Sequence, residues 1–326
     1  MSHAARVGLL GGGWIARVHA PAIDAEADAE LVAVCDLDAE RAHALAQPRG
    51  AAAYTSWEQM LEREKLDALW VCTPPTHHRA PTEAALALGL HVYLEKPIAR
   101  GVSDGEAIAA AAASADAVCA VGYQWHASEL VGVARDALGG AAPGLLVGRN
   151  FGPVAGRPWF MDEAEGGGQI LERGSHHIDL QRSLAGAIAS VRVAGAGAGL
   201  SGEPECGIDE AIVMELRFVS GALGTVQIAW TRPGQPEVYT TDVLADGATM
   251  QLELGPERFR LTGTSPRGPL DTTAADPMAR SIRRFLDAAA AGDATAVACS
   301  PADALQTLRV ASACETSLRE RREVVV

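Results

Sequence analysis

The first third of the chain alternates short apolar runs with alanine-rich segments, and this alternation limits the possible folds most strongly. The apolar runs predict strands at Ala5–Leu10, Glu30–Cys35, Ala68–Cys72, His91–Leu94 and Ala117–Val121. The segments between them predict helices near Trp14–Ala25, Ala39–Ala46, Ser56–Arg63, Arg79–Leu88 and Asp104–Ala115. Strands and helices that alternate at this spacing form a parallel sheet with helices on both faces. The strands lack polar alternation, as expected when both of their faces are buried.

A glycine-rich turn lies between the first predicted strand and the first predicted helix. Gly11, Gly13 and Ala16 match the pattern G-x-G-x-x-G/A, in which the glycines permit a tight turn and a close approach of a diphosphate to the backbone. The N-terminus of the following helix adds N–H groups and a partial positive charge. Asp36 follows Ala16 by 20 positions, where a carboxylate can accept the ribose hydroxyls of a dinucleotide. Asp36 would repel a 2′-phosphate, so we expect NAD rather than NADP, although Arg41 keeps NADP possible.

The pattern changes after Gly122. Helices are predicted at Ser128–Leu138 and from about Gly168 to Leu184, with a strand at Leu145–Phe151 between them. Longer strands follow at Val191–Ala198, Ala211–Phe218, Ala222–Trp230, Tyr239–Leu244, Thr249–Leu254 and Arg258–Thr262. The chain then returns to helices at Met278–Ala291 and Pro301–Glu320, the second with Ser300 as its N-cap. We therefore expect an α/β domain over residues 1–122 and an α+β domain with a mostly antiparallel sheet over 123–326.

Composition excludes several classes of protein. The net charge of −14 argues against nucleic acid as a partner, because neutralising phosphates takes clustered Lys and Arg. No run reaches the ~18 apolar residues of a membrane span, and the start of the chain leaves no room for a signal peptide, so we expect a cytoplasmic protein. The six cysteines are scattered, with no pair or Cys/His cluster at zinc spacing, so we expect free thiols and no metal.

Lysine is scarce in this chain: 25 of the 27 basic residues are Arg, and only Lys65 and Lys96 are Lys. Lys65 lies in a charged helix end, where a solvated surface role is sufficient. Lys96 follows the predicted strand His91–Leu94, and ligands of parallel sheets bind beyond the carboxyl ends of the strands. An ammonium can point at a single oxygen, which a forked guanidinium does less well. Lys96 is therefore a candidate active-site residue, with a surface ion pair to Glu95 as the alternative.

The chain resembles the Gfo/Idh/MocA oxidoreductases over nearly its whole length. The matching segments are Gly8–His19, Val32–Asp36, Thr73–His78, Gly89–Pro97, Gly166–Asp179 and Ser300–Val326. The resemblance implies an N-terminal Rossmann domain, and a C-terminal substrate-binding and oligomerisation domain whose large open sheet forms a homodimer or homotetramer interface. It also implies that the last helix, at about 301–320, packs back toward the first domain. The expected activity is hydride transfer between a nicotinamide cofactor and a secondary alcohol of a sugar, sugar derivative or cyclitol.

The resemblance also assigns site residues. Glu172, His176, Asp179 and Ser183 fall on one face of a predicted helix. By position His176 is similar to the general acid/base of the family, Glu172 to the carboxylate beside it, where relatives usually carry Asp, and Lys96 to the third polar member. The cofactor is expected to contact Gly11, Gly13, Trp14, Ile15, Asp36, Thr73, Pro74, His78, Glu95, Lys96 and Gln124. Candidate substrate contacts are Trp125, Arg157, Trp159 and His177, with core packing an equal alternative for the first three.

Two other functions fit part of this pattern. Bound NAD can oxidise a sugar transiently to assist elimination or glycoside cleavage, with no net production of NADH. A sugar or dinucleotide sensor on the same fold needs no chemistry, but the presence of Lys96 and His176 disfavours it. A short-chain dehydrogenase is excluded, since neither lysine has a tyrosine four residues before it.

Overall fold

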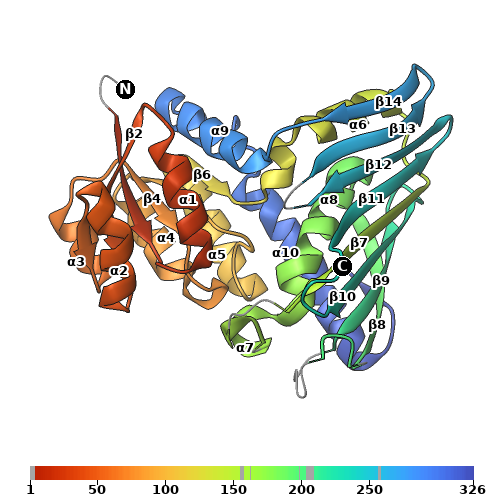
Figure 1. Ribbon diagram of the computed structural model, residues 1–326, viewed down its shortest axis with the longest axis horizontal. Helices are drawn as coiled ribbons and strands as arrows, with labels where there is room; N and C mark the ends of the chain where they lie inside the picture. The colour runs from red at the N-terminus through yellow and green to blue at the C-terminus, as the bar shows by residue number, and fades with distance from the viewer. Residues whose placement is uncertain (1–3, 155–157, 162, 198, 203–208, 256–257) are drawn as a thin grey trace. The chain divides into compact units, whose positions relative to one another are not determined.

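The computed structural model describes residues 4–154, 158–161, 163–197, 199–202, 209–255 and 258–326. These residues divide into two compact units (Figure 1). The first contains residues up to Gln124 together with Met278–Leu305, and the second contains Trp125–Pro277 and Gln306–Val326. The sequence boundary placed residues 278–305 in the second domain, whereas the structure packs this segment into the core of the first unit.

The first unit is built on a six-stranded parallel sheet in the order β3-β2-β1-β4-β5-β6. Its strands are β1 (Ala5–Leu10), β2 (Ala29–Cys35), β3 (Ala52–Tyr54), β4 (Ala68–Val71), β5 (His91–Leu94) and β6 (Cys119–Val121). Its helices are α1 (Trp14–Asp24), α2 (Ala39–Ala46), α3 (Trp57–Arg63), α4 (Arg79–Ala87), α5 (Val102–Ser114) and α9 (Pro277–Ala291), with short 3₁₀ turns η1 (Gln47–Arg49) and η2 (Pro75–His77). The predicted parallel sheet is thus confirmed, with β3 as a short edge strand that the sequence pattern did not indicate.

Aromatic packing explains why α9 belongs to the first unit. Trp70 of β4 stacks on Tyr93 of β5 with ring centroids 5.2 Å apart. Phe285 of α9 meets both rings edge-on, at 4.9 and 5.6 Å. The Tyr93 hydroxyl lies 3.0 Å from the Ser281 hydroxyl. Large aromatic side chains contribute much of the free energy of a core, so α9 is an integral part of this one.

The second unit is built on a nine-stranded mixed sheet in the order β14-β13-β12-β11-β7-β10-β9-β8-β15, in which β7 and β10 are parallel and the other neighbours antiparallel. The strands are β7 (Leu145–Pro153), β8 (Ile188–Ala196), β9 (Ala211–Phe218), β10 (Leu223–Thr231), β11 (Val238–Ala245), β12 (Ala248–Leu254), β13 (Phe259–Ser265), β14 (Gly268–Thr273) and β15 (Val324–Val325). The mostly antiparallel sheet predicted for this half is confirmed.

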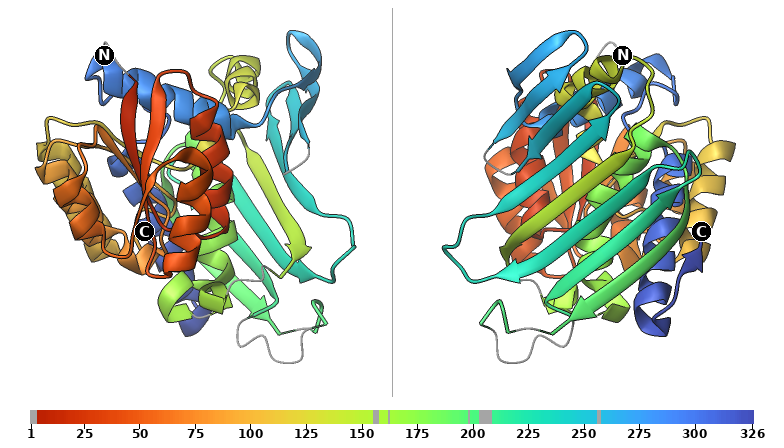
Figure 2. Two further views of the ribbon diagram at one scale, coloured as in Figure 1. Left: turned by 60° about the vertical axis from the view of Figure 1, so that its left-hand side comes forward. Right: turned by 90° about the vertical axis from the view of Figure 1, so that its right-hand side faces the viewer.

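One face of this sheet is buried and the other is not. Buried and more exposed residues alternate along β7, β9 and β10, as in a sheet with a single covered face. In the right-hand view of Figure 2 the strands face the viewer and α8 (Ser175–Ala185) lies behind them. The remaining elements are η3 (Gln124–Ala127), α6 (Glu129–Leu138), η4 (Pro158–Met161), α7 (Glu163–Gly166), η5 (Ile170–Gly174) and α10 (Pro301–Glu320), which begins in the first unit and continues in the second.

The segment predicted as one helix from about Gly168 to Leu184 is not a continuous α-helix. Residues Ile170–Gly174 form a π-helical turn, and α8 starts at Ser175. Gly174 packs tightly on the sheet, since a Cβ there would lie 2.8 Å from Met214 Cε and 3.0 Å from Ile228 Cδ1. Single π turns inside helices occur often at functional sites.

Candidate active site

The predicted cofactor residues of the first unit follow the ends of neighbouring parallel strands. Gly11, Asp36 and Glu95 directly follow β1, β2 and β5, and Thr73 is the second residue after β4. Because the strands are parallel, these positions lie at one edge of the sheet, where ligands of doubly wound sheets bind.

The glycine turn has the form that a diphosphate requires. Gly11 has φ of +98° and donates its N–H to Cys35 O at 2.7 Å. A Cβ at Gly11 would lie 2.6 Å from Cys72 O, so only glycine fits, whereas a Cβ at Gly13 would meet no described atom within 4 Å. Gly13 precedes α1, whose N-terminus has no side-chain cap among the described residues. This open turn and helix start therefore fit the diphosphate of a dinucleotide.

The carboxylate of Asp36, the predicted ribose ligand, is hydrogen-bonded to the backbone of the glycine turn. One carboxylate oxygen accepts the Gly12 N–H at 2.6 Å, and the other accepts the Asp38 N–H at 2.8 Å. Each carboxylate oxygen can accept more than one hydrogen bond, so both can still accept ribose hydroxyls. Of the other residues predicted here, Trp14 is 59% exposed and Ile15 packs partly against the core.

A buried ion pair lies directly before Lys96. Glu95 Oε1 lies 2.6 Å from His19 Nε2 of α1, and Glu95 Oε2 accepts the Lys96 N–H at 3.0 Å. Burial raises the pKa of Glu95, but the hydrogen bond from His19 and the positive charges of His19 and Lys96 lower it further, so its pKa lies below the usual range. Glu95 thus remains a carboxylate and fixes the backbone of Lys96, whose side chain is partly exposed. The peptide bond from Lys96 to Pro97 is cis.

His78 links the loop after β4 to the loop after β5. Its Nε2 lies 2.9 Å from Thr73 O, and its Nδ1 lies 3.3 Å from Ile98 O. Burial lowers the pKa of His78 despite these two carbonyl contacts, so the ring is neutral near pH 7. The side chain is fully buried, so His78 holds the backbone of the loop that carries the predicted cofactor residues Thr73 and Pro74.

In the second unit, Glu172 lies on the π turn and His176 on the first turn of α8, both partly exposed. His176 packs against Trp125 of η3, with ring centroids 5.0 Å apart and an interplanar angle of 36°. His177 meets the same indole edge-on at 5.0 Å. Unlike His176, His177 is buried, and its Nδ1 lies 3.1 Å from the Thr241 hydroxyl of β11.

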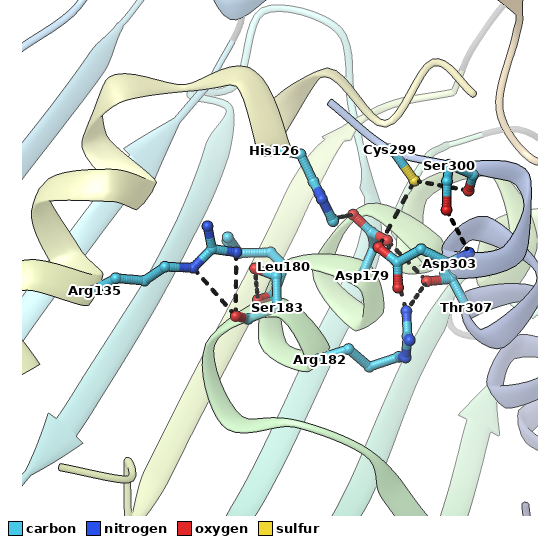
Figure 3. Close-up of polar contacts among 10 residues, drawn as sticks. All are labelled: His126, Arg135, Asp179, Leu180, Arg182, Ser183, Cys299, Ser300, Asp303 and Thr307. Carbon is cyan, nitrogen blue, oxygen red and sulfur yellow. Dashed lines mark hydrogen bonds and ion pairs between the residues drawn. The ribbon is translucent and has the colours of Figure 1, made fainter. Parts of the chain in front are cut away.

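Asp179 connects three elements of the second unit. From the sequence it was expected only to lie on the polar face of a helix. His126 Nε2 lies 2.6 Å from Asp179 Oδ2, and the Thr307 hydroxyl donates to Asp179 Oδ1 at 2.8 Å; Figure 3 shows these residues together. Arg182 donates to the Thr307 hydroxyl at 2.7 Å. Asp179 is 1% exposed, so this network holds α8 to η3 and to α10 inside the unit. The polar spacing along the helix was the only available signal.

The structure shows fewer contacts for the remaining predicted site residues that it describes. Gln124 begins η3 and is partly exposed. Trp159 is partly exposed next to Phe160, with ring centroids 6.1 Å apart. Arg157 lies outside the described residues. Lys96 belongs to the first unit and Glu172 and His176 to the second, so their meeting at one reacting centre stays a prediction.

The parallel sheet, the glycine turn and the acid after β2 define a dinucleotide-binding protein with a second α+β unit. Residues 5–123 match the model of the oxidoreductase family with an NAD-binding Rossmann fold, and residues 146–264 match that of the GFO/IDH/MocA C-terminal domain. The chain belongs to the Gfo/Idh/MocA family of oxidoreductases.

Similar proteins span most of the chain. D-apiose dehydrogenase of Paraburkholderia graminis is 30% identical over 279 residues, covering 82% of this chain and 72% of that protein. Myo-inositol 2-dehydrogenase of Thermotoga maritima is 23% identical and covers 98% of each chain. The structure of a levoglucosan dehydrogenase with NADH and L-sorbose aligns with a TM-score of 0.85 at 19% identity, covering 99% of each chain, which supports the fold. None of the described helices has the length and apolar composition needed to cross a membrane.

Proposed function

We propose that this protein is an NAD-dependent dehydrogenase that oxidises a secondary alcohol of a sugar, sugar derivative or cyclitol. The observation that carries the proposal is the position of Lys96, two residues after the end of β5 and at the same sheet edge as the open glycine turn. The sugar or cyclitol class follows from relatives named for D-apiose and myo-inositol.

Three side chains of this protein have a role in the proposed reaction. NAD supplies the hydride acceptor when bound. The His176 imidazole takes the hydroxyl proton at a ring nitrogen, the role that histidine most often has in general acid–base catalysis. The Lys96 ammonium stabilises the negative charge that develops on the alcohol oxygen. Glu172, one helical turn before His176, orients the imidazole or holds a neighbouring hydroxyl.

The preference for NAD over NADP rests on Asp36. Its carboxylate is fixed by the backbone of Gly12 and Asp38, so it cannot move away to admit a second negative charge. A 2′-phosphate at this position would meet like-charge repulsion at short distance.

A panel of polyols and sugars with NAD or NADP, followed by absorbance of the reduced cofactor, tests this function. We expect NADH production with at least one polyol or sugar and higher kcat/KM with NAD. Tight, copurifying NAD without net NADH would instead indicate transient oxidation, and binding without any turnover would indicate a sensor. Either outcome contradicts the proposal.

Two properties of the whole protein belong to the same proposal. A homo-oligomer, dimer or tetramer, formed through the exposed face of the nine-stranded sheet would cover Leu145, Leu223 and Leu244, which lie side by side on β7, β10 and β11. A cytoplasmic location agrees with the five cysteines among the described residues, all of them free thiols.

A further inference from the structure

We propose that Trp125 and His177 are positioning residues that hold the His176 ring in the orientation needed for proton transfer. This inference rests on the proposed role of His176 as the acid/base. All of the contacts that carry it lie within the second unit.

The indole of Trp125 contacts the rings of both histidines. Its indole lies 5.0 Å from the ring of His176, tilted by 36°, and 5.0 Å from the ring of His177, at 81°. Trp125 is 5% exposed, so its large surface is used for packing. The indole limits the directions in which the partly exposed His176 ring can turn.

The short turn that carries Trp125 is itself fixed to α8. The neighbouring residue His126 contacts the buried carboxylate of Asp179 at 2.6 Å, and Asp179 lies three residues after His176. The indole and the histidine ring are therefore attached to backbones that are held together by a second contact. Contacts from two directions fix a side chain more precisely than one.

His177 fixes α8 against the sheet. Its Nδ1 lies 3.1 Å from the Thr241 hydroxyl of β11. The ring occupies space that exists only because residue 148 of β7 is glycine, since a Cβ there would lie 2.8 Å from Nδ1. Burial lowers the pKa of His177 to about 3, so the ring is neutral at working pH and does not act as a proton donor or acceptor there.

One turn further along α8 the same arrangement recurs. Gln181 donates to Thr225 O of β10 at 2.9 Å, and its amide oxygen occupies the space beside Gly224. Two long polar side chains of α8 thus lie over two glycines of adjacent parallel strands, which sets the rotation of the helix about its axis. His176 is adjacent to His177, so this rotation also sets the direction of its side chain.

The experiment compares Trp125→Leu with Trp125→Phe, each alone and combined with His176→Gln. We expect Trp125→Leu to lower kcat roughly 10- to 100-fold, as misplacement of a reacting group by about 1 Å does. We expect Trp125→Phe, which keeps an aromatic face, to stay within about threefold of wild type, and KM to change little in both variants. Trp57→Leu, on α3 of the first unit, is the matched control and should leave kcat unchanged.

The double variants distinguish positioning from a general structural effect. If Trp125 acts through His176, Trp125→Leu lowers the residual rate of the His176→Gln enzyme by less than about twofold. A multiplicative loss, or a single-variant loss below about threefold, overturns the inference. Should Trp125→Leu fail to fold, His177→Leu, which places an apolar side chain in this buried position, is measured in the same cycle with the same expectation. If instead His176→Gln alone costs less than about tenfold, the proposed function itself fails.

Discussion

Glu95 illustrates how a buried charge fixes the position of its neighbour. Its carboxylate is held between His19, 76 positions earlier in the chain, and the backbone N–H of Lys96. Removing the His19 ring would leave the buried Glu95 carboxylate without this side-chain partner, which is strongly destabilising. The partly exposed side chain of Lys96 therefore extends from a backbone that a buried carboxylate holds in place.

The buried imidazole of His177 leads to a prediction about pH. Its pKa is lowered from 6.5 to about 3 in the folded protein, so the unfolded chain binds a proton first as the pH falls. The stability that neutral His177 contributes is complete above pH 6.5 and is lost progressively toward pH 3, by about 1.4 kcal/mol per pH unit. We expect wild type to lose about 2 kcal/mol more than His177→Leu between pH 6.5 and 5 in urea unfolding.

His78 and His91 also have lowered pKa values because of burial, but they are present in both proteins and cancel in this comparison. An identical pH dependence of unfolding for wild type and His177→Leu would show that His177 is not buried as a neutral group.

Candidate site residues with a local signal could be predicted from the sequence, whereas contacts between residues far apart in the chain could not. Gly11 and Asp36 stand at fixed spacings after a strand, so a local pattern identified them. The pairing of His19 with Glu95 and of His126 with Asp179 depends on how the elements pack, which no spacing reveals. The burial of His177 could not be predicted from a helical pattern either. It depends on the space beside Gly148, and the sequence does not show which side chain fills that space.

At the scale of elements, the strand–turn–helix unit β1–α1 is the part of the fold most directly adapted to a ligand. Its two glycines have different tasks. Gly11 needs its left-handed backbone and the close approach of Cys72, whereas Gly13 has open space on the side where a side chain would stand.

This difference predicts different results for two substitutions. Gly13→Ala should leave the thermal midpoint within about 2 °C of wild type and weaken NAD binding at least tenfold, because the methyl group occupies the space needed by the diphosphate. Gly11→Ala should lower both the thermal midpoint and the affinity for NAD, since its Cβ would lie 2.6 Å from Cys72 O. Calorimetric titration with NAD and thermal unfolding measure the two effects.

Gly101→Ala is the matched control, because Gly101 precedes α5 with φ of −121° and a Cβ there would meet no described atom within 4 Å. Unchanged NAD affinity in Gly13→Ala would contradict the assignment of this turn as the diphosphate site.

Element boundaries were predictable where periodicity was strong. Ala5–Leu10, Ala39–Ala46, His91–Leu94, Ala211–Phe218 and Pro301–Glu320 match the structure residue for residue. The missed strands β3, β14 and β15 are short or lie at sheet edges, so they carry little hydrophobic pattern. The π turn before α8 was not predictable, because the polar spacing of residues 172–183 fits a continuous α-helix.

At the scale of the whole molecule, the chain order of elements does not coincide with the compact units. The helix α9 lies late in the sequence but shares the aromatic core of the first unit through Phe285. A boundary drawn where the strand pattern changes could not anticipate this return. Each unit has its own sheet, and their different strand patterns made the two fold classes predictable.

The exposed face of the nine-stranded sheet allows a test of the proposed assembly. Leu223 is 43% exposed and Leu244 is 37% exposed, and both flank Leu145. Leu223→Arg would place a charge within this apolar surface, so we expect dissociation to smaller species in light scattering coupled to size exclusion. Leu88→Arg, at a leucine after α4 of the first unit that is more exposed still, should leave the assembly unchanged. A wild-type protein that runs as a monomer would contradict the proposal.

The most direct test of the central claim is the kcat of Lys96→Met with NAD and the best polyol or sugar of the panel. The substitution removes the ammonium and keeps a side chain of similar length. We expect a loss in kcat of at least tenfold, about 1.4 kcal/mol or more of transition-state stabilisation, with the thermal midpoint little changed. A loss smaller than tenfold would contradict the role assigned to Lys96 in the reaction.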